Sequence, residues 1–215
     1  MIAVIKGDII GSRTVPEAER WLQPLKEVLG NYGQSPQDWE IAWGDALQLQ
    51  IPDGIKALET AVHIKATIKA ILPADQTQNN GPLDIRMAIG MGEMQFQAER
   101  IAESNGTAFV CAGDAFDQLK QLKTNLLLSS GEEDFDEMIN LYLQLSLLFM
   151  DNWTTADAAL VKTWLKNPNA TQSELGEALG IKQNSVSGRW KRAHVTELKA
   201  VMTFFEKRYT KTFGQ

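Results

Sequence analysis

Alternating apolar and polar positions predict a β-sheet in the first 130 residues. One run is almost wholly apolar, which is typical of a central strand, and the others alternate as half-buried strands do. The predicted strands are residues 2–5, 39–43, 46–51, 84–92 and 126–128. The second and third would pair as a β-hairpin whose bend holds Gly44 and Asp45.

Apolar residues at helical spacing predict helices between these strands. We expect helices from Pro16 to about residue 29, over 55–72 and over 114–123, and a short helix ending at 101. Residues 107–112 could be a strand or a turn, and the polar stretch 73–82 predicts a loop. The order βαββαβ favours an α+β fold of the ferredoxin-like type, with helices on one face of the sheet.

After residue 130 the pattern becomes wholly helical. Thr171 and Glu174 have the spacing of a capping box, Gly180 supplies a turn, and residues 182–192 predict a basic helix. This is the layout of a helix-turn-helix. The predicted divisions are an α+β domain at 1–130, a linking helix at 131–152 and an all-α helix-turn-helix domain at 153–215. The last helix could continue to about residue 209, with an apolar seam that packs on the N-terminal domain or pairs two chains.

The charge is distributed unevenly along the chain. Residues 161–215 contain ten Lys or Arg and four acids, so this part carries +6 and the remainder carries −12 of the net −6. Such asymmetry is typical of a basic segment that faces phosphates, although a chance cluster of surface lysines would give it too. The single cysteine excludes an intramolecular disulfide, and no apolar run approaches the roughly 20 residues of a membrane helix. With no basic leader before the first strand, we expect a cytoplasmic protein without membrane contact.

The basic helix carries side chains suited to DNA. Amides near the start of such a helix can read base edges, and hydroxyl and cationic side chains can hold phosphates. The candidate DNA-binding residues are Lys182, Gln183, Asn184, Ser185, Ser187, Arg189, Lys191 and Arg192. The stretch resembles the last conserved DNA-binding region of sigma factors, although three-helix units of this kind also serve for docking or dimerisation. A homodimer is expected, because one such unit makes few base contacts.

Two aspartates in the N-terminal domain suit chemistry. Asp8 stands at the end of the first strand, and Asp45 lies at the hairpin bend. If the hairpin pairs beside the first strand, the two carboxylates converge and could hold Mg²⁺ or Mn²⁺ with a nucleotide. Small neighbours would let backbone N–H groups approach phosphate, and these are Gly7, Gly11, Ser12 and Gly44. Equally, both aspartates could be turn residues, and we expect Arg86 to pair with an acid rather than a phosphate.

The N-terminal motifs resemble the catalytic domain of class III nucleotide cyclases. The stretches that carry this resemblance are residues 8–12, 44–45, 86–93 and 106–112. It implies that Asp8 and Asp45 are the metal pair. Val110 and Asp114 stand where that family has Asn and Arg, and neither can stabilise a transferring phosphate, which favours a non-catalytic domain. The whole chain resembles the bacterial SatD family, through motifs at residues 6–13, 44–48, 85–90 and 113–116.

These patterns predict a DNA-binding transcriptional regulator whose cyclase-like domain senses a nucleotide, metal or small anionic ligand. One alternative is a divergent metal-dependent nucleotidyl-transfer or cyclase-like enzyme with a docking tail. The other is a non-catalytic interaction scaffold.

Overall fold

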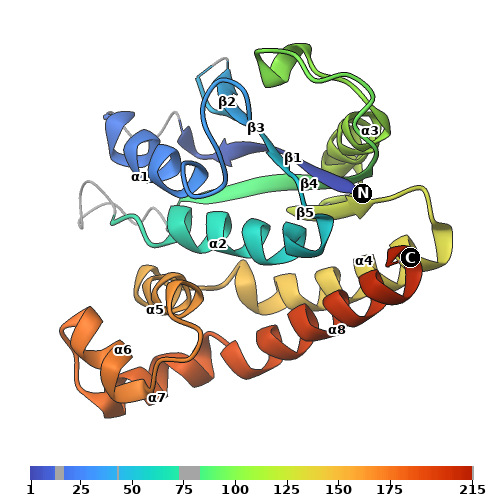
Figure 1. Ribbon diagram of the computed structural model, residues 1–215. Helices are drawn as coiled ribbons and strands as arrows, with labels where there is room; N and C mark the ends of the chain where they lie inside the picture. Colours follow the sequence, from blue (N-terminus) through green and yellow to red (C-terminus); the bar gives the residue numbers. More distant parts are fainter. Residues whose placement is uncertain (13–16, 43, 73–82, 215) are drawn as a thin grey trace.

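A five-stranded mixed sheet forms the centre of the molecule (Figure 1). The computed structural model describes residues 1–12, 17–42, 44–72 and 83–214. The strands are β1 (Ile2–Ile10), β2 (Trp39–Ala42), β3 (Ala46–Ile51), β4 (Asp84–Gly92) and β5 (Leu126–Ser129). They lie in the order β2-β3-β1-β4-β5, with β5 parallel to β4 and the other neighbours antiparallel. All five predicted strands are present, but β1 runs on to Ile10 instead of ending at residue 5, so Asp8 lies within the strand and not at its end.

Two helices complete the predicted βαββαβ order. Helix α1 (Glu19–Leu29) joins β1 to β2, and α2 (Ala57–Lys69), which follows the 3₁₀ turn η2 (Gly54–Lys56), lies between β3 and β4 in sequence. With the five-stranded sheet, this confirms the α+β class and the predicted βαββαβ order. The expected helix start at Pro16 and the expected loop at 73–82 lie outside the described residues.

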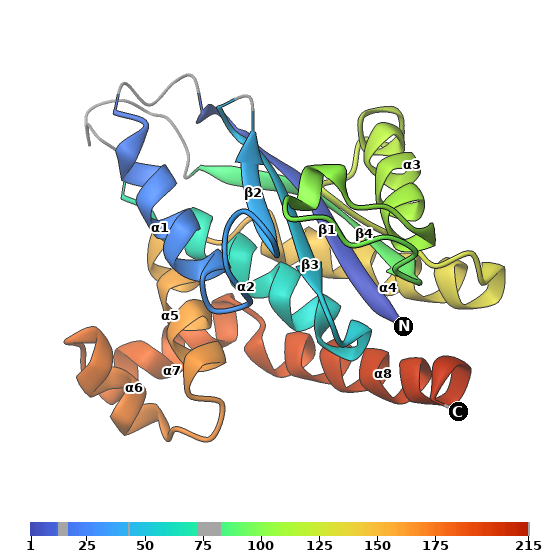
Figure 2. The ribbon, with the colours of Figure 1, turned by 45° about the horizontal axis from the view of Figure 1, so that its top comes forward.

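Helices cover both faces of the sheet, so the expectation of helices on one face is wrong (Figure 2). Helix α3 (Thr107–Leu122) packs on β4 and β1, on the face opposite α1 and α2. The reason is that β4 is buried on both faces from Met87 to Gly92, and a strand with two apolar faces needs cover on each. Gly90 permits the approach, because a Cβ there would lie 2.1 Å from the backbone nitrogen of Ala112.

The start of α3 also corrects two local predictions. Residues 107–112 form the beginning of helix α3 and are neither a strand nor an isolated turn. The expected short helix ending at 101 is wrong, because the helical residues between β4 and α3 are those of the 3₁₀ turn η3 (Ile101–Glu103). Gly106, with φ of 153°, sets the start of the helix, and the hydroxyl of Thr107 accepts a hydrogen bond from the Glu93 amide. Alanines 108 and 112 then face the sheet. Tertiary packing against the glycines of β4 outweighs the strand-like local pattern.

Helix α4 (Glu133–Met150) packs on the sheet through its contact with β5. Phe135, Ile139 and Leu143 are buried in the same apolar core as the sheet. The side chain of Asn140 accepts a hydrogen bond from the Leu128 amide and donates one to the Leu128 carbonyl, each 2.8 Å long. At Leu128, the backbone groups on the outer edge of β5 are therefore already hydrogen-bonded to a side chain.

Four further helices follow, and the first and last of them pack back on the N-terminal part. They are α5 (Thr155–Lys166), α6 (Gln172–Leu179), α7 (Gln183–Arg192) and α8 (Val195–Phe213). Helix α5 lies against α2, and α8 runs beside α4 (Figures 1 and 2). Near the end of α8, Tyr209 donates a hydrogen bond to the Met1 carbonyl. The expected continuous helix after residue 193 is wrong, because His194 takes a left-handed φ of 53° and breaks it. The apolar seam of α8 packs on the N-terminal part, which was one of its two predicted roles.

One apolar core joins all of these segments, from Ala3 in β1 to Tyr209 in α8. The division into domains at residues 130 and 152 therefore stays a prediction. Within the described part of the chain, no helix is long and apolar enough to cross a membrane.

Candidate functional site

The sheet register brings the two predicted aspartates to one edge. Strand β1 pairs with β3, so Asp8 lies opposite Ala46, the residue next to Asp45 in the hairpin bend. On its other side Asp8 lies opposite Arg86 of β4. The hairpin does pair beside the first strand, which was the condition for the two carboxylates to converge.

Arg86 forms a two-point ion pair with the carboxylate of Asp8. Its Nε donates to Oδ1 over 2.7 Å, and its Nη2 donates to Oδ2. Both side chains are 23% exposed, so the pair is only partly screened by solvent. The hydrogen bond to Asp8 raises the pKa of Arg86, against the opposing effect of burial. The expectation that Arg86 pairs with an acid is confirmed.

The second aspartate is held by the loop after β1. Ser12 donates its hydroxyl hydrogen to Oδ2 of Asp45. Gly11 and Gly44, with φ of 83° and 95°, provide the backbone conformation of the two loops. Gly7 lies inside β1, where a Cβ would sit 2.7 Å from the Arg86 carbonyl oxygen. Strand packing therefore already accounts for that glycine.

This arrangement does not fit a divalent metal held between two free carboxylates. Both oxygens of Asp8 accept from a guanidinium, and Asp45 accepts from a hydroxyl. Among the described residues, no group of three or more His, Cys, Asp or Glu side chains could hold a metal ion. Val110 and Asp114 lie exposed on α3. The metal pair and the nucleotide-binding loop residues stay predictions.

Helix α7 presents most of the predicted DNA-binding residues to solvent. The first of them are exposed: Lys182, Gln183, Asn184 and Ser185. Lys191 is also exposed, and Ser187 and Arg189 are partly exposed. Arg192 differs, because its Nη2 donates to Oδ1 of Asp157 over 3.0 Å and the Asp157 side chain is 4% exposed.

The framework beneath α7 follows the sequence prediction. The capping box of Thr171 and Glu174 is present, and Gly180 takes a left-handed φ of 64° between α6 and α7. Val186 is fully buried, and the ring of Trp190 packs edge-on against Trp164 of α5. Helix α7 packs on α5, α6 and α8, at the end of the molecule away from α3 (Figure 1). Its outer side is therefore not covered by the sheet domain.

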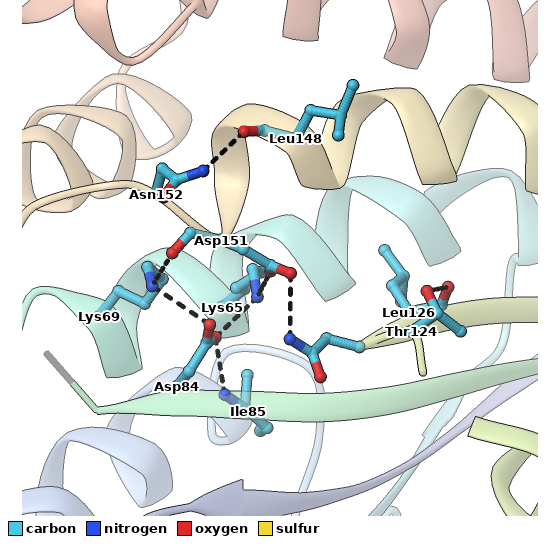
Figure 3. A network of polar contacts seen from close by, with 10 residues as sticks. Lys65, Lys69, Asp84, Ile85, Thr124, Leu126, Leu148, Asp151 and Asn152 are labelled. Carbon is cyan, nitrogen blue, oxygen red and sulfur yellow. Dashed lines mark hydrogen bonds and ion pairs between the residues drawn. The ribbon is translucent and has the colours of Figure 1, made fainter. Parts of the chain in front are cut away.

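A buried charge network was missed at the level of sequence (Figure 3). Nζ of Lys65 in α2 lies 2.6 Å from Oδ1 of Asp84 and 2.6 Å from Oδ1 of Asp151. Nζ of Lys69 donates to Oδ2 of Asp84 over 3.1 Å and to the Asp151 carbonyl over 2.8 Å. Both lysine side chains are nearly inaccessible, and burial lowers the pKa of Lys69. The network ties α2, β4 and the end of α4 together. The sequence did contain a sign of this network. Residues 58, 62, 65 and 69 follow helical spacing, which places both lysines on the buried stripe of α2.

Similarity to known proteins is confined to the fold. No family model matches the chain, and no curated protein matches it. Among solved structures, the chain is similar to the GGDEF domain of DgcB from Caulobacter crescentus in complex with c-di-GMP. The sequence identity is 15% and the TM-score is 0.40, covering 61% of this chain and 78% of that chain. A likeness of this size assigns no role to any residue, and the resemblance to the SatD family rests on the sequence motifs alone.

Proposed function

We propose that this protein binds DNA through helix α7, as a cytoplasmic regulator. The observation that carries the proposal is the start of α7, where a lysine, two amides and a serine are exposed. A recognition helix enters the major groove with its N-terminal residues foremost, and amide side chains there can pair with adenine edges. The +6 charge of residues 161–215 supplies the attraction to phosphate.

Arg192 has a different role in this proposal. Asp157 is 4% exposed and would be left without its cationic partner if Arg192 were removed. We therefore assign Arg192 to the positioning of α7 against α5. Arg192 is itself 60% exposed, but its guanidinium is engaged by Asp157, so we assign DNA contact to exposed residues outside this ion pair, above all Lys182, Asn184 and Lys191.

Fluorescence anisotropy with a labelled mixed-sequence duplex of about 30 base pairs tests the proposal. The full chain should bind, and Lys182→Ala/Lys191→Ala should weaken binding about tenfold, because two cations that face DNA phosphates are removed. The matched control is Lys207→Ala/Lys211→Ala, which removes the same charge from exposed positions on the far part of α8. This control should change the affinity less than twofold. Equal weakening in both variants, or no binding by the wild type, would contradict DNA contact through α7.

A second candidate function is nucleotide binding at the end of β1. The convergence of Asp8, Ser12, Asp45 and Arg86 at one edge favours it. Asp8 fixes the Arg86 guanidinium, and a fixed guanidinium is suited to phosphate oxygens. We propose that Arg86, rather than a metal ion, meets the phosphates of a bound nucleotide, and that this domain senses the nucleotide without turning it over.

Thermal-shift measurements with ATP and GTP, in EDTA and in Mn²⁺, test this second candidate. Stabilisation is expected in EDTA and should disappear in Arg86→Lys when each variant is compared with its own nucleotide-free state. Arg100→Lys is the control, since Arg100 is paired with Glu40 on β2. Stabilisation that requires Mn²⁺ would instead support the metal pair, and stabilisation that survives in Arg86→Lys would contradict the proposed contact.

A further inference from the structure

Helix α4 is apolar on two opposite sides, and the chain covers only one of them. Its inner side, which includes Phe135, Ile139 and Leu143, is buried in the core. On its outer side Leu141, Leu145 and Leu148 are 55%, 52% and 71% exposed. An apolar side of a helix is normally buried. The outer apolar side of α4 has no partner among the described residues of one chain.

The exposed leucines form one continuous stripe. The spacing of 141, 145 and 148 is the alternation of four and three residues that forms the seam of paired helices. Leu122, at the end of α3, is 54% exposed and lines the adjoining groove together with Leu141 and Leu148. We call these four leucines the α4 stripe. Monomeric proteins rarely expose contiguous apolar patches above a few hundred Å², and such patches usually mark interaction sites.

We infer that a second copy of this chain covers the α4 stripe, with the two α4 helices packed antiparallel about a two-fold axis near Leu145. A two-fold axis is the commonest symmetry of protein dimers, and it sets the same stripe against itself. Leu141 of one copy then lies near Leu148 of the other, and each leucine meets a leucine. The proposal does not depend on DNA binding.

The charges around the stripe favour the antiparallel arrangement. The groove has a volume of about 760 Å³ and is lined by both Lys123 and Glu137. Asn125 donates to Asp151 over 3.0 Å, which places the turn holding Lys123 beside the C-terminal end of α4. In an antiparallel pair, Glu137 of the partner subunit reaches that end and meets Lys123. A parallel pair would instead set the acidic first turns of the two helices, with Glu133 and Asp134, against each other.

Pairing through the β5 edge is the competing route to a dimer. At Leu128 it is blocked, because Asn140 already bonds both the amide and the carbonyl of that residue. The Leu126 carbonyl accepts from the Thr124 hydroxyl over 3.3 Å. With these edge groups satisfied, the leucines of α4 offer more to a second copy than the strand does.

Sedimentation velocity of the full chain at micromolar concentration tests the inference. The wild type should be a dimer, and Leu145→Glu should be a monomer, with its dissociation constant raised at least about tenfold. Leu72→Glu is the matched control: Leu72 is 66% exposed but lies outside the α4 stripe, so this variant should remain dimeric. Circular dichroism should show that all three proteins are folded, because the substituted leucines are exposed.

Charge reversal tests the orientation. Lys123→Glu and Glu137→Lys should each weaken the dimer about fivefold, since the two-fold axis repeats each repulsive pair. The double variant Lys123→Glu/Glu137→Lys should restore wild-type affinity. A monomeric wild type, a dimer that survives Leu145→Glu, or equal dissociation by Leu72→Glu would overturn the proposed interface. A double variant as weak as the single ones would overturn the antiparallel arrangement.

Discussion

At the scale of single residues, His63 is held in a site made for the neutral imidazole. It is 7% exposed, and its Nδ1 lies 2.8 Å from the hydroxyl oxygen of Tyr32. Its Nε2 is buried with no hydrogen-bond partner in the described part of the chain. Burial, together with Lys166 and Lys162 of α5, lowers the pKa of His63 to about 4.

The folded protein should therefore become less stable in mild acid. The unfolded chain binds a proton at His63 below about pH 6.5 and the folded chain only near pH 4. Stability is thus full above pH 6.5 and falls as the pH approaches 4. Urea denaturation should give a free energy of unfolding roughly 1–2 kcal/mol lower at pH 5 than at pH 7.5, with part of this difference absent in His63→Gln. A pH dependence unaltered by His63→Gln would refute the explanation.

At the scale of elements, the apolar pattern predicted the strands because β1, β3, β4 and β5 each have at least one buried face, while β2 is partly buried along its length. The capping box and Gly180 likewise predicted the α6–α7 turn, since both are local signals. The first turns of α3 could not be predicted in this way, because they depend on glycines about twenty residues earlier. The same distinction holds for the candidate site. Local alternation predicted the hairpin bend at Asp45, whereas the Lys65 network joins three segments that the sequence does not place together.

The contact between β4 and α3 gives a paired prediction about two glycines. A Cβ at Gly90 would lie 2.2 Å from the Ala108 carbonyl oxygen, so Gly90→Ala should force α3 away from the sheet and cost about 3 kcal/mol. Gly113 is partly exposed within α3, and the nearest atom to its Cβ position is Nζ of Lys6 at 3.4 Å, an ordinary contact with a flexible side chain. Gly113→Ala should therefore stabilise the helix by about 0.5–1 kcal/mol. Thermal denaturation of both variants is the measurement, and a Gly90→Ala protein as stable as the wild type would contradict the close packing.

At the scale of the whole molecule, the shared apolar core predicts that the sheet and the C-terminal helices unfold together. Phe205 packs against Phe135 of α4, and Trp153 donates to the Ala193 carbonyl over 3.0 Å, so the segments are joined at several points. Far-ultraviolet circular dichroism and tryptophan fluorescence should report one coincident transition in urea. Trp21 and Trp164 lie in different parts of the core, and both should respond at the same midpoint. Two separated transitions would show that the predicted domains are independent.

The separation of charge also belongs to the whole molecule. The acidic N-terminal part should repel DNA, so binding has to be confined to the basic helices that lie away from the sheet. This restricts the orientation in which the protein can approach a duplex. It also makes the affinity strongly dependent on salt, because the favourable contacts are mainly with phosphates.

The most direct test of DNA contact through α7 is the affinity of the full chain for duplex DNA measured over a series of KCl concentrations. We expect a linear fall of log affinity with log salt, and Lys182→Ala/Lys191→Ala should make that slope shallower by about 2, or about 1 for each lysine that no longer neutralises a phosphate. The slope of Lys207→Ala/Lys211→Ala should match the wild type. An affinity independent of salt, or a slope that Lys182→Ala/Lys191→Ala leaves unchanged, would contradict DNA contact through α7.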